Sequence, residues 1–212
     1  YQNDSNQGVG FTKKRLAELA NGEVCGFLDP DDALTENAIE NSVKNHTEKN
    51  VVTYSKFLLC DANLNYLKLF PQSRAIKNGD EKFFNIFLEA NHFFTFKKSA
   101  YNKTSGINAD LTSAVDQDLY LKLYEIGNFT FINEALYYYR LHEKGVSQEK
   151  SKKGKLNENW QKVILDTAKR RNIGRLYGKD IQDIDNLPEF IFKNQNTFLK
   201  KIRYLVINHT SP

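Results

Sequence analysis

The chain has 212 residues, of which 40% are hydrophobic and 13% aromatic, so it is long enough to bury a sizeable core. It contains no run of 18 or more apolar residues, and the sequence therefore offers no candidate for a membrane-spanning helix. The net charge of +4 is uneven: residues 149–212 carry 14 Lys and Arg against 7 Asp and Glu, whereas the rest of the chain is slightly acidic.

Local patterns predict alternating helices and strands along the first 140 residues. Helices are indicated where apolar residues recur every three to four positions, and strands where short apolar runs are rich in β-branched or aromatic residues. In chain order the predicted elements are a helix over 11–20, a strand over 24–28, a helix over 35–49, a strand over 51–59, a loop over 63–80, a helix over 81–90, a strand over 93–96, a helix over 116–126 and a strand over 129–139.

The pattern changes near residue 149, where the sequence becomes polar, basic and helical in character. Mixed strands and helices before this point indicate an α/β fold. We therefore expect one domain over 1–148 and a basic, mostly helical extension over 149–212. Two interpretations of the extension stay open: its charge meets an anionic partner such as a membrane surface, or it covers an apolar face of the domain itself.

Three carboxylates follow the predicted strand over 24–28 within four positions. They are Asp29, Asp31 and Asp32, separated by Pro30. Clustered carboxylates repel one another, so a positive charge is expected among them. Oxygen ligands at the carboxyl edge of a sheet suit a hard divalent cation that reaches substrate phosphates. The alternative is a polar turn before the next helix.

Two further polar groups occur later in the chain. Asp116 and Asp118 open a helix, where the helix dipole stabilises carboxylates, and a carboxylate there can act as a general base if it reaches a hydroxyl. Arg140 and His142 leave an aromatic strand, with Ser147 five residues further on, and such side chains can contact a diphosphate and its metal. Each group also has a structural interpretation, helix capping for the acids and a core position for the histidine.

The order and spacing of these groups are more specific than any one of them. The segments are Asn6-Gln7-Gly8, Ala20-Asn21-Gly22-Glu23, the Asp29 to Asp32 cluster, Ser105-Gly106-Ile107, Val115-Asp116, and Tyr139-Arg140-Leu141-His142 with Ser147. In this arrangement residues 6 to 147 resemble glycosyltransferase family 2, the inverting sugar transferases with the GT-A fold. The chain departs from the family at Lys13-Lys14, where Arg-Asn is usual, and at Val115, where Glu is usual. The family's opening nucleotide-binding strands have no counterpart here.

The resemblance implies a Rossmann-like mixed sheet with flanking helices and assigns a role to each motif. Asp116 becomes the catalytic base that deprotonates an acceptor hydroxyl. A Mn²⁺ or Mg²⁺ ion is expected on Asp29, Asp31, Asp32 and His142. Substrate contacts are expected from Lys13, Gly106, Asp118, Arg140 and Ser147.

The implied function is transfer of a sugar from a nucleotide-sugar to a hydroxyl of a saccharide or lipid-linked acceptor, in the synthesis of cell-surface polysaccharide. No nucleic-acid partner is expected, and the sequence does not indicate the oligomeric state. Cys25 and Cys60 lie in apolar runs and do not form a disulfide scaffold, which favours a cytoplasmic location, including the inner face of the membrane if the basic extension binds there.

Two alternatives come from different classes of protein. A domain of the same fold can bind a carbohydrate or nucleotide-sugar without catalysis, because fold alone does not give function. The segment Phe27 to Thr35 also resembles the first motif of haloacid-dehalogenase-type phosphatases, in which the first Asp is a nucleophile. Those enzymes usually have Gly-Thr after the second Asp, and here Asp32-Ala33 follows.

Overall fold

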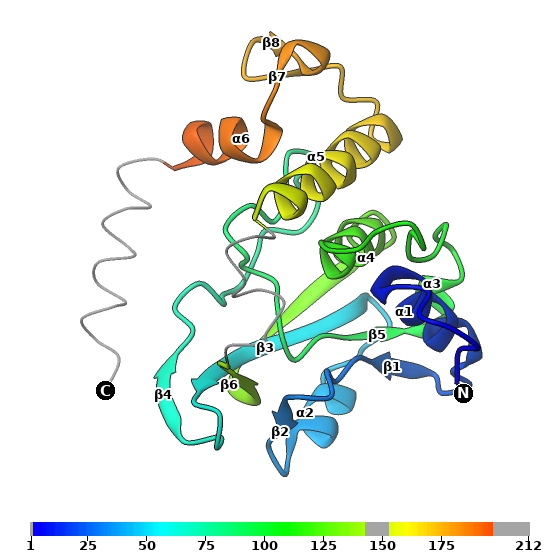
Figure 1. Ribbon diagram of the computed structural model, residues 1–212, viewed down its shortest axis with the longest axis vertical. Coiled ribbons are helices and arrows are strands. Elements are labelled where there is room, and N and C mark those ends of the chain that lie inside the picture. Colours follow the sequence, from blue (N-terminus) through cyan, green and yellow to red (C-terminus); the bar gives the residue numbers. More distant parts are fainter. Residues whose placement is uncertain (1, 143–152, 197–212) are drawn as a thin grey trace.

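The computed structural model describes residues 2–142 and 153–196, and the α/β expectation is confirmed for them (Figure 1). A mixed six-stranded sheet has the order β1-β5-β3-β6-β2, and β4 pairs with the outer part of β3. The strands are β1 Val24–Gly26, β2 Ala33–Leu34, β3 Asn50–Cys60, β4 Tyr66–Leu69, β5 Thr95–Lys97 and β6 Asn128–Arg140. Because β3 and β6 are parallel and β5 is antiparallel to β1 and β3, the strands β1, β3 and β6 end at the same edge.

The two central strands are buried on both faces. Along β3, Val52 and Tyr54 point into one apolar cluster and Phe57 into another, as the two-residue period of a strand requires. The first cluster packs under α4 (Val115–Tyr124), and the second includes Ala38 of α2 (Ala38–Lys44). The other helices of this part are α1 (Val9–Leu19) and α3 (Lys98–Tyr101).

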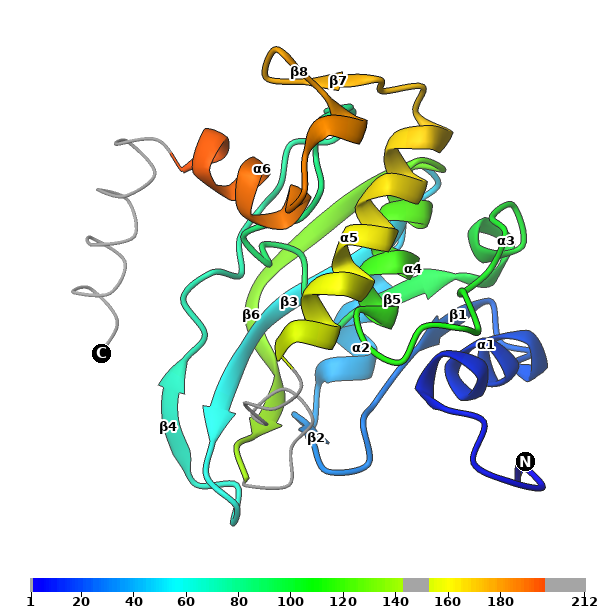
Figure 2. The same cartoon turned by 45° about the horizontal axis from the view of Figure 1, so that its top comes forward.

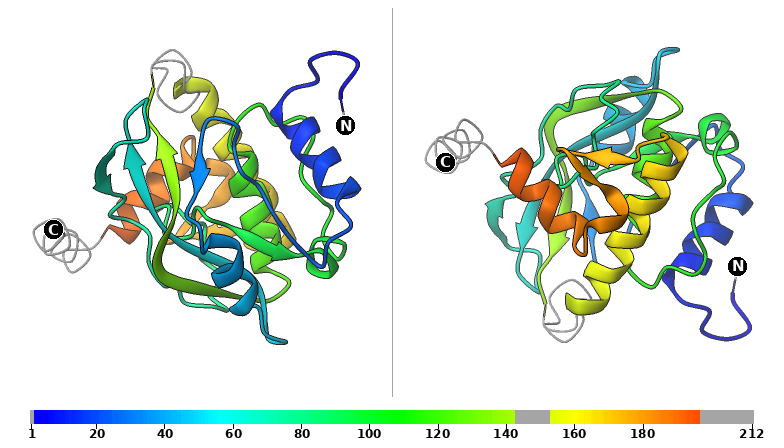
Figure 3. Two further views of the ribbon diagram at one scale, coloured as in Figure 1. Left: turned by 90° about the horizontal axis from the view of Figure 1, so that it is seen from below. Right: turned by 90° about the horizontal axis from the view of Figure 1, so that it is seen from above.

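The described part of the C-terminal extension packs against the domain. It comprises α5 (Lys153–Arg170), the hairpin of β7 (Arg175–Leu176) and β8 (Lys179–Asp180), the 3-10 helix η2 (Ile181–Asp183) and α6 (Leu187–Gln195). Helix α5 lies between α4 and α6 in every view (Figures 1, 2 and 3). Phe84, Ile86 and Phe87 of the preceding domain join the apolar cluster of this extension. Up to residue 196 the extension therefore covers an apolar face of the domain.

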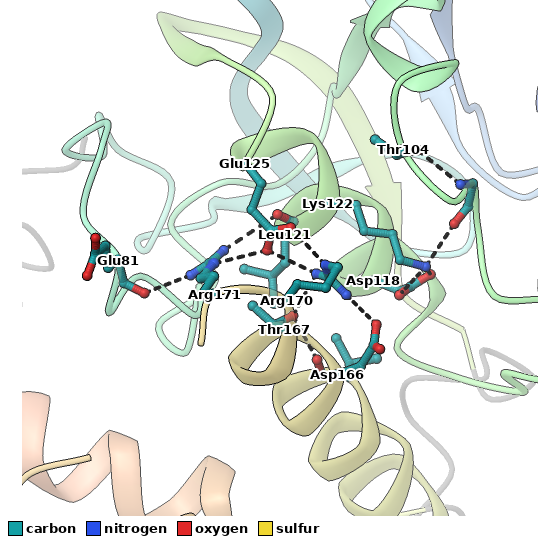
Figure 4. Close-up of polar contacts among 12 residues, drawn as sticks. Glu81, Thr104, Asp118, Leu121, Lys122, Glu125, Asp166, Thr167, Arg170 and Arg171 are labelled. Atoms are coloured by element: carbon teal, nitrogen blue, oxygen red, sulfur yellow. Dashed lines mark hydrogen bonds and ion pairs between the residues drawn. The ribbon is translucent and has the colours of Figure 1, made fainter. Parts of the chain in front are cut away.

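An ionic cluster fastens α5 to the end of α4 (Figure 4). Glu125 accepts hydrogen bonds from Arg170 Nε at 2.7 Å and from Arg171 Nε at 3.0 Å. Arg171 also donates to the carbonyls of Glu81 and Phe83, so it braces the segment before α4 as well. Two of the basic residues of the extension, Arg170 and Arg171, are thus paired within the molecule.

Three sequence predictions need correction. The helix over 81–90 is wrong: this segment forms turns, because the Asn85 amide bonds both to the backbone N–H and to the carbonyl of Ala90. The helix over 35–49 is shorter than predicted, since Thr35 bonds to Asn37 and the helix runs only from Ala38 to Lys44. The predicted loop over 63–80 contains β4, which pairs with the end of β3.

No helix among the described residues is both long and apolar enough to span a membrane. The last part of the extension, residues 197–212, lies outside the described residues, so a membrane contact there stays a prediction. Ser147 lies outside them too.

Acid should destabilise this fold in part through His46. Its ring bonds Thr95 Oγ1 at 2.9 Å, and burial lowers the pKa of His46 to about 4. In the unfolded chain the pKa is about 6.5, so between these values the unfolded state binds the extra proton and stability falls as the pH falls. We expect the free energy of unfolding of wild type to lose about 2 kcal/mol from this group between pH 7 and pH 5. In urea unfolding, His46→Gln should not show this loss. If the free energy of unfolding falls equally with pH in both proteins, the assignment to His46 is contradicted.

Candidate functional site

The acidic loop after β1 crosses to the end of β6 at the common edge of strands β1, β3 and β6. The short strand β2 is responsible, because Ala33 pairs with Tyr138 and Leu34 with Tyr137. This pairing brings Asp31 and Asp32 to Arg140 and His142. The edge is the place where open α/β sheets bind ligands.

Asp32 is part of the framework of this edge. Its carboxylate accepts hydrogen bonds from Tyr137 Oη at 2.6 Å and from the Arg140 backbone N–H at 2.8 Å. Burial raises the pKa of Asp32, although these two bonds oppose the shift. Asp32 therefore holds the loop onto β6.

Asp31 and His142 form the exposed pair of the site. His142 Nε2 lies 2.7 Å from Asp31 Oδ2, and the two side chains are 25% and 43% exposed. The hydrogen bond from His142 lowers the pKa of Asp31, against the effect of its partial burial. The Arg140 guanidinium stabilises the loop by donating hydrogen bonds to the carbonyls of Asp31 and Ala62. A phosphate contact by the same guanidinium stays a prediction.

Lys13 is the positive charge expected among the carboxylates. Its Nζ lies 2.8 Å from Asp116 Oδ1 and 3.2 Å from Asp29 Oδ1. Burial alone would lower the pKa of Lys13, but the two carboxylates outweigh it and raise the pKa above its ordinary value. Lys13 therefore stays charged and links α1, the acidic loop and the first turn of α4. Asp116 keeps 38% of its side chain exposed and remains accessible beside this pair.

A small hollow lies beneath the Lys13 bridge. It has room for about one water molecule, about 10 Å³, and it is lined by Lys13, Asp29, Asp116, His92, Phe27, Phe94 and Tyr120. Lys13 Nζ lies 5.4 Å from the centre of the Phe27 ring. Sequence analysis did not identify His92, because it precedes a strand without any recognisable motif.

Asp118 is not among the residues that line this hollow, and its assignment as a substrate contact stays a prediction. The side chain is buried and pairs with Lys122 at 2.9 Å (Figure 4). It also accepts a hydrogen bond from the backbone N–H of Asn108. Lys122 donates in addition to the Gly106 carbonyl at 2.8 Å. Gly106 is buried with φ +69°, a backbone conformation that favours glycine. Asp118 and Gly106 thus stabilise the loop before α4 through contacts inside the domain. A sugar contact by the Gly106 backbone stays a prediction.

The loop that ends in Asp116 is fixed from two sides. From α5, the Asn159 amide donates to Ser113 Oγ at 2.8 Å and to Thr112 Oγ1 at 3.1 Å. From α1, the Gly10 N–H donates to the Leu111 carbonyl at 3.1 Å. The C-terminal extension thus takes part in placing Asp116, which the division into two segments did not anticipate.

Gly10→Ala should disturb this arrangement strongly. A Cβ at Gly10 would lie 2.5 Å from the Leu111 carbonyl oxygen, 2.7 Å from that of Asn108 and 2.9 Å from that of Ala109. We expect a loss of about 1–3 kcal/mol in the free energy of unfolding, because backbone must shift to admit the methyl group. Chemical denaturation measures it. Gly174→Ala is the control, since a Cβ there meets nothing within 4 Å, and equal effects at both positions would contradict the close packing.

Of the four predicted metal ligands, Asp31 and His142 lie together in this structure, and the full set of four stays a prediction. Among the residues that the structure describes, no group of three or more His, Cys, Asp and Glu side chains is placed to hold an ion. Asp29 is paired with Lys13, and Asp32 with Tyr137. Asp31 and His142 supply one oxygen and one nitrogen at an exposed edge, which suits a cation that takes its other ligands from water and phosphate.

Comparison with known proteins gives relatives and a fold. No family model matches the chain. It is 31% identical over 195 residues to the chondroitin synthase of Escherichia coli, which covers 89% of this chain and 27% of that protein. It is 28% identical over 207 residues to the hyaluronan synthase of Pasteurella multocida, covering 94% and 20%. The chain thus spans a fifth to about a quarter of the length of these curated relatives.

Solved structures with the same fold include S. aureus TarS 1–349. Its complex with UDP-GlcNAc superposes with a TM-score of 0.60 and 13% sequence identity, over 98% of this chain and 62% of that one. Its complex with UDP gives a TM-score of 0.53 at 17% identity, over 94% and 53%. The predicted mixed sheet with flanking helices is confirmed by this match.

Proposed function

We propose that the chain, which has the GT-A fold, carries the catalytic edge of a metal-dependent, inverting transferase that moves a sugar from a nucleotide-sugar to a hydroxyl of a saccharide or lipid-linked acceptor. One observation carries the proposal. The Asp31–His142 pair and the Lys13–Asp116 bridge come from separate parts of the chain, and both lie beside the same edge of the sheet. The names of the relatives, hyaluronan synthase and chondroitin synthase, support a polysaccharide as the product.

The diphosphate of the donor is proposed to bind at Asp31 and His142. A Mn²⁺ or Mg²⁺ ion held there supplies charge that stabilises the departing diphosphate. Of the neighbouring folds, TarS was solved with UDP-GlcNAc, which makes UDP the first nucleotide and UDP-GlcNAc the first donor to test. The loop is preformed for this task, because Asp32 and Arg140 hold the backbone of the Asp31 turn.

Asp116 is proposed as the general base. The acceptor O–H gives its proton to the Asp116 carboxylate while the oxygen bonds to the anomeric carbon. The bond from that carbon to the diphosphate oxygen breaks on the opposite face, and the nucleoside diphosphate leaves with the bonding electrons. Lys13 fixes one oxygen of Asp116, and the exposed part of the side chain remains open to an acceptor.

A non-catalytic binding module remains the rival hypothesis, whereas a phosphatase is disfavoured by the transferase relatives and by the pairing of Asp29 with Lys13. The two surviving hypotheses differ in turnover. The full-length protein should release UDP from one member of a panel of UDP-sugars when Mn²⁺ is present, faster with an oligosaccharide acceptor, and EDTA should stop it. Binding of a UDP-sugar without any release of UDP would favour the binding module.

The membrane contact and the cytoplasmic location stay predictions. The part of the extension that the structure describes packs on the domain, and this supports the structural interpretation for residues 153–196.

A further inference from the structure

We propose that His92 is a further substrate-contacting residue of this site, and that its imidazole hydrogen-bonds a hydroxyl of the donor sugar. The proposal rests on the proposed function and adds a specificity-determining group to it. His92 lies on a different segment from the acidic loop, α1 and α4, yet lines the same hollow as Lys13, Asp29 and Asp116.

The ring of His92 is held rigidly by aromatic neighbours. It stacks on Tyr137, with ring centres 4.6 Å apart and planes 14° apart, and the Phe57 ring meets it edge-on at 5.5 Å. Tyr137 in turn donates to Asp32 at 2.6 Å. The imidazole is therefore positioned by the same framework that holds the acidic loop, as a binding group requires.

The ring nitrogens lack a protein partner within the described ranges 2–142 and 153–196. Hydrogen bonds are recorded there for the backbone N–H and carbonyl of His92, to Asn91 and Ser55, but none for its imidazole. Burial lowers the pKa of His92, so the ring is neutral and offers one donor and one acceptor, the complement of a hydroxyl group.

The size and position of the hollow favour the donor sugar over the other parts of the substrates. The hollow has room for about one water molecule, about 10 Å³, so it receives one small polar group such as a single hydroxyl. Asp29, on its wall, stands two residues before Asp31, where the diphosphate is proposed to bind. The diphosphate carries the nucleoside at one end and the transferred sugar at the other. The sugar end lies beside the proposed base Asp116, which lines the same hollow, so a sugar hydroxyl is the group nearest to His92.

The test compares His92→Phe with wild type in the full-length protein. Phe keeps the stacking on Tyr137 and removes both nitrogens. With the donor that the UDP-sugar panel identifies, we expect kcat/KM for transfer to fall about 10- to 100-fold, while the affinity for UDP alone and the unfolding midpoint change little. His46→Gln is the matched control, because His46 is also partly buried but bonds Thr95 away from the hollow, and it should leave kcat/KM unchanged.

A series of monodeoxy donors separates a sugar contact from a structural effect. The donor that lacks the contacted hydroxyl should react equally with wild type and His92→Phe, whereas the other deoxy donors should retain the full difference. His92→Gln, which keeps a donor group, should recover part of the loss. A difference that is the same for every donor, or wild-type kcat/KM in His92→Phe, would overturn the proposal. Absence of turnover in wild type would instead overturn the proposed function. In that case the ¹⁵N resonances of His92 test the sugar contact alone. If UDP-GlcNAc shifts them no more than UDP does, the sugar contact is also ruled out.

Discussion

Asp116→Asn is expected to lower kcat by about 10²–10⁴, the range by which general acid–base catalysis accelerates reactions. The amide is the same size as the carboxylate and can still accept a hydrogen bond from Lys13, so the first turn of α4 should keep its place. It cannot take the acceptor proton. Donor affinity should change little, because the proposed diphosphate contacts come from Asp31 and His142 on other elements.

Two neighbouring acids make the test of Asp116 specific. Asp110→Asn, at an exposed position in the same loop, should retain kcat. Asp118→Asn should act through stability, because it leaves Lys122 as a buried charge without its carboxylate, at a cost of about 3–5 kcal/mol. Steady-state kinetics together with urea unfolding separates the two effects. If Asp116→Asn keeps the wild-type kcat, Asp116 is not the general base.

Asp31→Ala is the second substitution with a large expected effect. It removes one of the two side chains that fit a metal ion, so that His142 is the one proposed ligand left. Metal-assisted charge stabilisation is worth several kcal/mol, so Mn²⁺-dependent kcat/KM should fall about 10²- to 10⁴-fold. The loop itself should stay folded, because Asp32 and β2 hold it to β6.

Calorimetric titration with Mn²⁺ in the presence of UDP gives an independent measure of the same site. Binding should be lost in Asp31→Ala and unchanged in Glu36→Gln, which alters an exposed carboxylate five residues further along the same loop. Turnover by wild type that persists in EDTA would argue against a metal at Asp31 and His142.

The strands were the most predictable part of the fold. The segments 51–59 and 129–139 are long runs rich in β-branched and aromatic residues, and they became β3 and β6 with ends displaced by one residue. The segment 81–90 was not predictable in the same way. The spacing of its apolar residues predicts one face of a helix. In the structure Asn85 instead holds this segment in turns, and its apolar residues pack in the core shared with α5.

The site was predictable as a collection of residues and not as an arrangement. The sequence placed carboxylates after a strand but could not show that they would separate, Asp29 to Lys13, Asp31 to His142 and Asp32 to Tyr137. That separation depends on β2, a two-residue strand too short to have a sequence pattern. His92 and Asn159 carry no motif either, because their positions result from the packing of segments that are distant in sequence.

The configuration of the first product tests the central claim most directly. The account holds that Asp116 activates an acceptor which attacks the anomeric carbon opposite the diphosphate at the Asp31–His142 edge. Proton NMR during the first turnovers of the full-length protein with its α-linked UDP-sugar donor, Mn²⁺ and an oligosaccharide acceptor should show a β-linked product. An α-linked first product would contradict the account.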